Sequence, residues 1–128
     1  MSTLRGRTIV VVGAEEPGAR ALARALAAEG AAVALLGVRA GPDAEFAIAS
    51  IANELWALEV RHVMAPAGDS PDPYAQAERV RAELGEPDGL VSLAGDLTPW
   101  RDAFGCPAVD ARDVPPETAL RLLASLVG

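Results

Sequence analysis

Four short apolar runs, separated by longer segments with helical spacing, constrain the fold of this chain more than any other feature. The runs are Thr8 to Val12, Ala32 to Leu36, Val60 to Ala65 and Leu90 to Ala94. Continuous runs of this length, rich in β-branched residues, are typical of strands buried on both faces of a parallel sheet. Repeated strand–helix–strand units imply right-handed crossovers, with helices on both faces. The pattern therefore predicts an α/β fold whose doubly wound parallel sheet has about four strands in the order 3-2-1-4.

Glycine and proline mark the ends of the intervening helices. We expect helices from about Gly18 to Glu29, from about Tyr74 to Leu84 and from about Glu117 to Leu126, and a long helix that Gly41-Pro42-Asp43 caps and that ends at about Leu58. Residues 96–113 show no clear period, so we expect an irregular segment there. A chain of 128 residues is within the range of one domain. We therefore expect residues 1–128 to form a single domain, equivalent to half of a doubly wound fold.

Charge and cysteine content narrow the function classes. A net charge of −7 would repel phosphate backbones and anionic lipid, so neither nucleic acid nor a membrane surface is an expected partner. The single cysteine, Cys106, cannot form an internal disulfide, and no signal-peptide pattern opens the sequence. No apolar run approaches the roughly 20 residues needed to span a bilayer. We therefore expect a cytoplasmic protein.

A loop with two glycines joins the first predicted strand to the first predicted helix, and it contains Gly13, Glu15 and Gly18. In an open α/β sheet, the helix N-terminus at this place presents free backbone N–H groups to a pyrophosphate, so these residues are candidates for binding a dinucleotide. Glu15 and Glu16 bring negative charge next to the expected anion, and Pro17 removes one N–H donor. Because proline and acidic residues also suit a helix N-terminus that holds no ligand, a purely structural turn is the alternative.

This loop resembles the phosphate loop of the short-chain dehydrogenase/reductase superfamily, which reads Thr-Gly-x-x-x-Gly-x-Gly. Val12 falls on the threonine, Gly13 on the first glycine, Pro17 on the second and Ala19 on the third. The resemblance covers roughly residues 5–95, the nucleotide-binding half of the superfamily. It implies a Rossmann-like fold with an NAD(P) site.

Two further segments resemble the same superfamily. The run DGLVSLAG that ends at Gly95 is similar to a fourth strand ending in Asn-Asn-Ala-Gly; Ala94 and Gly95 match, whereas serine and leucine replace the asparagines. The run from Ala65 to Asp69 is similar to the segment whose aspartate contacts adenine, with Gly68 counted as one inserted residue. The resemblance therefore implies that Ala94, Gly95 and Asp69 lie at the cofactor.

The end of the second predicted strand bears on the choice of cofactor. It offers no acid to hold a ribose 2′-hydroxyl, and Arg39 lies close enough to meet a 2′-phosphate. This favours NADP over NAD, while a solvated loop cation is the alternative role for Arg39. Binding of NADP, binding of NAD and the lack of any cofactor all stay open on the sequence.

The reaction centre of the superfamily is not found in this sequence. It needs a Tyr-x-x-x-Lys pair, but the sequence holds no lysine, and its one tyrosine, Tyr74, is followed four positions on by Glu78. We therefore assign no catalytic residue. His62 and Cys106 are the only imidazole and thiol, too few for a zinc site, and we assign no metal site. Four acids follow the last strand as solvated loop residues or, alternatively, as cation or acid/base groups: Asp96, Asp102, Asp110 and Asp113.

Association with a partner is predicted from the sheet and from the aromatic residues. In a sheet of four strands the Leu90 to Ala94 edge would be uncovered, and unpaired edges favour association. Exposed aromatic residues can mark an interface, with packing inside the protein as the alternative. The candidates are Phe46, Trp56, Trp100 and Phe104. We therefore expect a homo-oligomer, with the final helix as a further contact, or else a partner protein chain.

The hypothesis that follows is a truncated, degenerate domain of the short-chain dehydrogenase/reductase type, without its own catalytic centre, that acts as a nucleotide-sensing or protein-interaction module. Two alternatives stay open. One is the nucleotide-binding half of a split NAD(P)-dependent oxidoreductase that another chain completes. The other is a structural or assembly subunit that binds no ligand.

Overall fold

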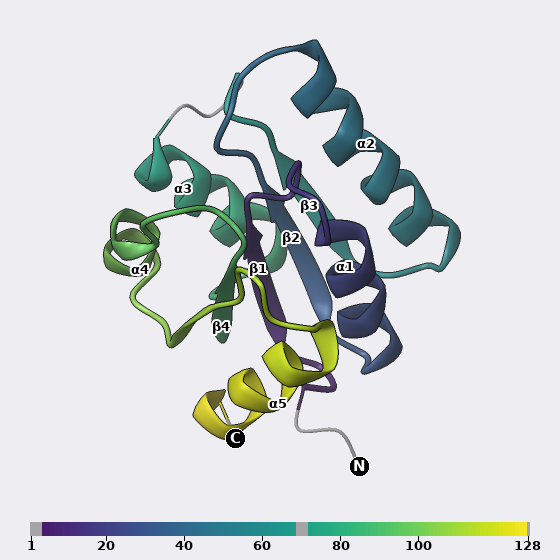
Figure 1. Ribbon diagram of the computed structural model, residues 1–128, viewed down its shortest axis with the longest axis vertical. Helices are drawn as coiled ribbons and strands as arrows, with labels where there is room; N and C mark the ends of the chain where they lie inside the picture. The colour runs from purple at the N-terminus through teal and green to yellow at the C-terminus, as the bar shows by residue number, and fades with distance from the viewer. Residues whose placement is uncertain (1–3, 69–71, 128) are drawn as a thin grey trace.

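Five parallel strands form one sheet in the order β3-β2-β1-β4-β5, and helices cover both of its faces (Figure 1). The computed structural model describes residues 4–68 and 72–127. In chain order the elements are β1 (Thr8–Val12), α1 (Ala19–Ala28), β2 (Ala32–Leu36), α2 (Pro42–Ala57), β3 (His62–Ala65), α3 (Pro73–Leu84), β4 (Gly89–Ser92), α4 (Thr98–Phe104), β5 (Ala108–Asp110) and α5 (Pro116–Val127). The predicted α/β class and strand order are confirmed, and a short fifth strand extends the sheet beyond β4.

Alternate residues of the central strand β1 point into two separate cores. Ile9 and Val11 pack with α1, α2 and α5 on one face, and Val10 and Val12 pack with α3 and α4 on the other. All four side chains are fully buried. Because both faces of the strand are covered, its sequence is a continuous apolar run and does not alternate between apolar and polar residues.

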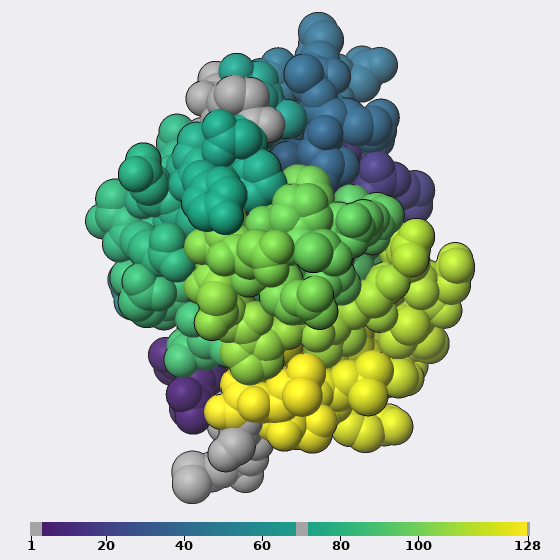
Figure 2. All heavy atoms as spheres, turned by 90° about the vertical axis from the view of Figure 1, so that its left-hand side faces the viewer, coloured from purple at the N-terminus to yellow at the C-terminus, as the bar shows by residue number. Residues whose placement is uncertain are grey.

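The segment 96–113, which we expected to be irregular, contains both α4 and β5. β5 pairs with β4, with Val109 opposite Val91. In the space-filling view this green segment crosses the middle of the molecule between α3 and α5 (Figure 2). The expectation of an uncovered β4 edge is therefore wrong, because β5 covers it. The sequence did not predict β5, since a strand of 3 residues is too short to show a period of two. Phe104, expected at the surface, is only 2% exposed because α4 packs it into the second core.

The docking of α5 depends on a glycine in β4. A Cβ atom at Gly89 would lie 2.8 Å from Cδ1 of Leu123 and 3.0 Å from Cγ1 of Val127. The missing side chain thus lets the last helix pack directly on the sheet, beside α1. In the part of the chain that the structure describes, every helix is too short or too polar to cross a bilayer.

Candidate functional site

The carboxyl ends of β1, β2 and β4 meet where the order of the strands changes direction. Such a switch point is where open α/β sheets bind ligands. Gly13 follows β1 with a φ of 82°. A Cβ atom at this position would lie 3.0 Å from the backbone nitrogen of Ala94, which follows β4. Because glycine has no side chain and accepts a positive φ, the β1–α1 loop can lie against the end of β4, directly at the switch point.

The β1–α1 loop leads into an uncapped helix N-terminus. Gly18 is the N-cap of α1, and no side chain caps this end of the helix. Within residues 4–68 and 72–127, no acceptor is found for the backbone N–H groups of Gly18, Arg20 and Ala21. Free donors of this kind, combined with the positive end of the helix dipole, favour a phosphate or another anion.

Glu15 reaches from the same loop to the end of β2. Its Oε2 accepts hydrogen bonds from the backbone N–H groups of Val38, at 2.9 Å, and Arg39, at 2.8 Å. The residue is 9% exposed, and its Oε1 is buried without a partner among the described residues. The end of β2 is where a doubly wound fold places the ribose of a dinucleotide. Glu15 therefore occupies, with its own carboxylate, two backbone donors that a ribose phosphate could otherwise use.

Arg39 is paired inside the same loop cluster. Its Nε donates to Oε1 of Glu16 at 3.2 Å, and its side chain is 61% exposed. An exposed pair of this kind contributes about 0–1 kcal/mol, so it neutralises charge more than it stabilises the fold.

A buried glutamine joins the carboxyl ends of β2 and β3 to two helices. Nε2 of Gln76 donates to the carbonyl oxygens of Gly37, at 2.8 Å, and Ala65, at 3.0 Å. Nε1 of Trp100 in turn donates to Oε1 of Gln76 at 2.8 Å. Gln76 is 1% exposed, and both N–H donors and the oxygen of its amide are hydrogen-bonded. The network holds α3 and α4 to the carboxyl ends of β2 and β3.

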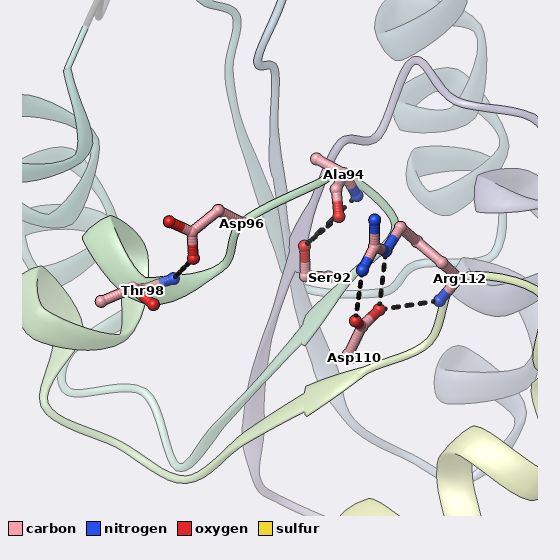
Figure 3. A network of polar contacts seen from close by, with 6 residues as sticks. All are labelled: Ser92, Ala94, Asp96, Thr98, Asp110 and Arg112. Atoms are coloured by element: carbon pink, nitrogen blue, oxygen red, sulfur yellow. Dashed lines mark hydrogen bonds and ion pairs between the residues drawn. The ribbon is translucent and has the colours of Figure 1, made fainter.

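Local hydrogen bonds and an ion pair lie at the carboxyl ends of β4 and β5 (Figure 3). Ser92 accepts from the backbone N–H of Ala94 at 3.2 Å, and the guanidinium of Arg112 contacts both carboxylate oxygens of Asp110. These hydrogen bonds from Arg112 lower the pKa of Asp110.

The acidic residues beyond β4 do not gather into a metal site. Hydrogen bonds from the side chain and backbone of Thr98 lower the pKa of Asp96. The described residues contain no group of three or more potential ligands that could hold a metal ion. Asp96 and Asp110 are thus engaged with near neighbours in the sequence, in the way of solvated loop residues.

A hollow of about 350 Å³ lies beside the uncapped end of α1. Its lining comes from the β1–α1 loop, α1, the residue after β4, the segment between β5 and α5, and α5 itself: Pro17, Gly18, Leu22, Leu93, Ala111, Asp113, Val114, Pro116 and Ala119. The lining is mostly apolar, with the N-terminal ends of α1 and α5 on either side. A ligand here would combine an anionic group at α1 with an apolar part in the hollow.

The structure brings most of the predicted site residues to one edge of the sheet. Gly13, Glu15, Gly18, Arg39, Ala94 and Gly95 lie in the segments that follow β1, β2 and β4. Asp69 lies outside the described residues. Sequence reasoning missed Gln76, although a glutamine one residue before the buried Ala77 was a signal for a polar network. It named Trp100 as a candidate for an interface or for packing inside the protein, without its hydrogen bond to Gln76.

His62 and Cys106 lie away from this edge. Nδ1 of His62 is 2.8 Å from the carbonyl oxygen of Val60, a local contact at the start of β3. Cys106 is half-buried and packs against the second core, where burial raises the pKa of its thiol to about 11.

No protein-family model matches the sequence, and no curated protein matches it either. Solved structures do. A blue fluorescent protein from a metagenomic library, in complex with NADPH, is 31% identical, with a TM-score of 0.60 over 70% of this chain and 36% of that one. Carveol dehydrogenase from Mycobacterium avium, in complex with NAD, is 22% identical, with a TM-score of 0.62 over 74% and 38%. A protein of Pseudomonas syringae assigned as a short chain dehydrogenase is 31% identical, with a TM-score of 0.57 over 75% and 39%.

The sheet order and the loop at the switch point define a Rossmann-like α/β domain. More narrowly, the chain is similar in fold and sequence to short-chain dehydrogenases/reductases, and it matches their nucleotide-binding half. The chain spans a little over one third of the length of these three structures, as their covered shares of 36%, 38% and 39% show.

Proposed function

We propose that this chain is a dinucleotide-binding domain of the short-chain dehydrogenase/reductase type that works as a nucleotide-sensing or protein-interaction module, without a reaction centre of its own. The observation that carries the proposal is the uncapped N-terminus of α1, whose free N–H groups lie at the switch point of the sheet. Two of the similar structures contain NADPH or NAD. The part of the ligand that best fits these donors is a pyrophosphate.

At the carboxyl ends of the strands, the pyrophosphate of a dinucleotide fits better than a 2′-phosphate on its ribose. The N–H groups of Gly18, Arg20 and Ala21 suit a pyrophosphate, and the hollow beside α1 leaves room for an apolar ring. At the end of β2, a 2′-phosphate would meet the carboxylate of Glu15, and Arg39 is already paired with Glu16. The negative charges of the Glu15 carboxylate and a 2′-phosphate repel each other, and this repulsion opposes binding of NADP. We therefore place NAD ahead of NADP as the ligand, in contrast to the preference that Arg39 alone favours.

General acid/base chemistry on an alcohol or carbonyl needs a positioned group of suitable pKa. Tyr74 is 63% exposed at the start of α3, and the sequence has no lysine to lower the pKa of a tyrosine. We expect the isolated chain to show no turnover of alcohols or carbonyls with either nicotinamide cofactor. Turnover that persists through repeated purification would contradict this part of the proposal.

A split enzyme is the second candidate, because the similar structures are nearly twice as long as this chain. In that case another chain would supply the tyrosine and lysine. Activity that arises only when a second purified chain is added would favour the split enzyme over a sensing module.

The test is a titration of NAD, NADH, NADP and NADPH against the thermal stability of the chain. A ligand at about 100 times its dissociation constant stabilises the folded state by about 2.7 kcal/mol. We expect NAD or NADH to raise the melting temperature more than the phosphorylated forms do. A failure of all four ligands to stabilise a correctly folded chain would overturn the proposal and favour a structural or assembly subunit.

A matched pair of variants locates the binding. Ala21→Glu adds a carboxylate at the N-terminus of α1, where it suits the helix dipole but competes with a phosphate. Ala28→Glu makes the same change at the other end of the helix, and both positions are exposed. We expect Ala21→Glu to abolish stabilisation by the nucleotide and Ala28→Glu to retain it.

A further inference from the structure

β3 is an edge strand whose outer backbone groups are open. It pairs with β2 on one side only, where the carbonyl oxygens of Arg61 and Ala65 accept from β2 and from the residue after it. Because successive residues of a strand point their N–H and C=O groups to opposite sides, His62 and Met64 direct theirs away from β2. No other strand of the described chain lies on that side. This edge can therefore accept a further strand.

Apolar surface and hollows flank this edge. A hollow of about 320 Å³ follows it between α2 and α3, with Trp56 in its lining. A second hollow, of about 390 Å³, is lined by Trp56, Ala57, Glu59 and Val60. Trp56 is 76% exposed and Leu58 is 58% exposed. Large apolar side chains beside open hollows are typical of a surface that binds another protein.

The charged residues along the β3 edge of one copy can pair with those of a second copy. Arg79 and Glu83 lie one helical turn apart on α3, and both line the hollow of about 320 Å³ between α2 and α3. Neither forms an ion pair within residues 4–68 and 72–127. The same holds for Glu59 and Arg61 at the start of β3. A two-fold axis that passes beside Arg79 and Glu83 reverses the order of this pair, so that the arginine of each copy faces the acid of the other.

The other edge of the sheet lacks these features. β5 has only 3 residues, and Asp110 at its end is already paired with Arg112. Although the whole chain carries a net charge of −7, acids and arginines balance along the β3 edge. Two copies can therefore approach each other there with little charge repulsion.

We propose that a second copy of this chain pairs antiparallel with β3, about a two-fold axis that passes by Val63 perpendicular to the sheet. His62 of each copy then lies opposite Met64 of the other, and each such pair exchanges N–H···O bonds in both directions. The two sheets become one, α3 of each copy lies near α3 of the other, and Arg79 meets Glu83 across the axis. This inference does not depend on nucleotide binding, since the edge lies away from the β1–α1 loop.

The first test is sedimentation of the purified chain over a range of concentrations at moderate salt. We expect twice the mass of the chain at high concentration. Arg79→Glu or Glu83→Arg places like charges across the axis, so each should raise the dissociation constant of the dimer about tenfold. The double variant Arg79→Glu/Glu83→Arg restores the pairing and should regain most of the affinity. Arg121→Glu, an equal charge change on the exposed face of α5, should leave the dimer unchanged.

The second test is a cross-link, made in a Cys106→Ala background. In the proposed register, Val63 lies directly opposite its own copy, with Cβ atoms about 5 Å apart. Val63→Cys should therefore form a disulfide-linked dimer under mild oxidation. Val109→Cys, at the middle of the other edge strand, is the matched control and should stay monomeric when denatured without reductant.

Three outcomes would overturn the proposal. One is a chain that stays monomeric at hundreds of micromolar with a native far-UV spectrum. Another is a dimer whose affinity neither charge reversal changes. The third is cross-linking through Val109→Cys in place of Val63→Cys, which would assign the contact to β5. Failure of the nucleotide titration would not affect any of these measurements.

Discussion

The carboxylate of Glu15 accepts the backbone N–H of Arg39 at 2.8 Å, across the gap between the β1–α1 loop and the end of β2. The same Oε2 accepts the N–H of Val38 at 2.9 Å. Backbone donors at a strand end need an acceptor when water cannot reach them. Glu15 supplies one from the chain itself, at the place where the fold would bring the ribose of a dinucleotide.

Glu15→Ala should lower the free energy of unfolding by about 1–3 kcal/mol, because it leaves two backbone donors without their acceptor. Urea denaturation measures the loss. The matched control is Glu16→Ala, which breaks only the exposed pair with Arg39 and should cost less than about 1 kcal/mol. Equal losses of unfolding free energy in the two variants would show that the hydrogen bonds of Glu15 stabilise the fold no more than the exposed ion pair of Glu16 does.

The combined variant Glu15→Ser, Glu16→Arg and Pro17→Gly should strengthen NADP binding, because it frees donors at the end of β2, adds a cation and restores one N–H. The far-UV spectrum should stay the same. Isothermal titration with NADP measures the gain. An unchanged affinity in a folded variant would mean that some other part of the chain limits binding.

Gln76→Leu should destabilise the fold by about 1–3 kcal/mol, since it leaves the carbonyl oxygen of Gly37 and the indole N–H of Trp100 unpaired and removes one of the two hydrogen bonds to the carbonyl oxygen of Ala65. Trp100→Phe removes only the last of these bonds and should cost less. Because both variants break the same contact, their costs should add to more than the cost of the double variant. Additive costs would contradict a direct coupling between the two side chains.

Cys106 should react slowly with thiol reagents in the folded chain. Burial raises the pKa of its thiol from 9.0 to about 11, so the thiolate is about a hundredfold scarcer than in the unfolded chain at neutral pH. The unfolded chain loses this proton first. The free energy of unfolding should therefore fall as the pH rises from about 9 towards about 11. Alkylation rates measured in buffer and in urea check the reactivity, and equal rates below pH 9 would refute it. Urea denaturation at several pH values between about 8 and 11 checks the stability.

The strands and long helices could be predicted because their signals are local. Val10 and Val12 belong to a run that is apolar at every position, and Gly13 ends it. β5 was missed because its 3 residues carry too little pattern. The topology also fixed the place of the β1–α1 loop at the switch point.

The internal contacts of the site could not be predicted in the same way. The bond from Val38 to Glu15 joins residues 23 apart, and an acid in a loop gives no local sign of its partner. For Arg39 the sequence left open a 2′-phosphate contact or a solvated loop cation, because it cannot show that Glu16 lies next to it. Gln76 is different, since its place on the buried face of α3 was visible in the spacing of Ala77 and Val80.

The opposite surroundings of the two tryptophans give this chain a built-in optical readout. Trp56 is 76% exposed beside β3, whereas the indole of Trp100 is bonded to a buried amide. Iodide in solution can reach the first ring far more easily than the second. Fluorescence quenched by iodide thus reports on the outer edge of the sheet, and the emission that survives reports on the packing between α3 and α4. One unlabelled sample can follow events at both places at once.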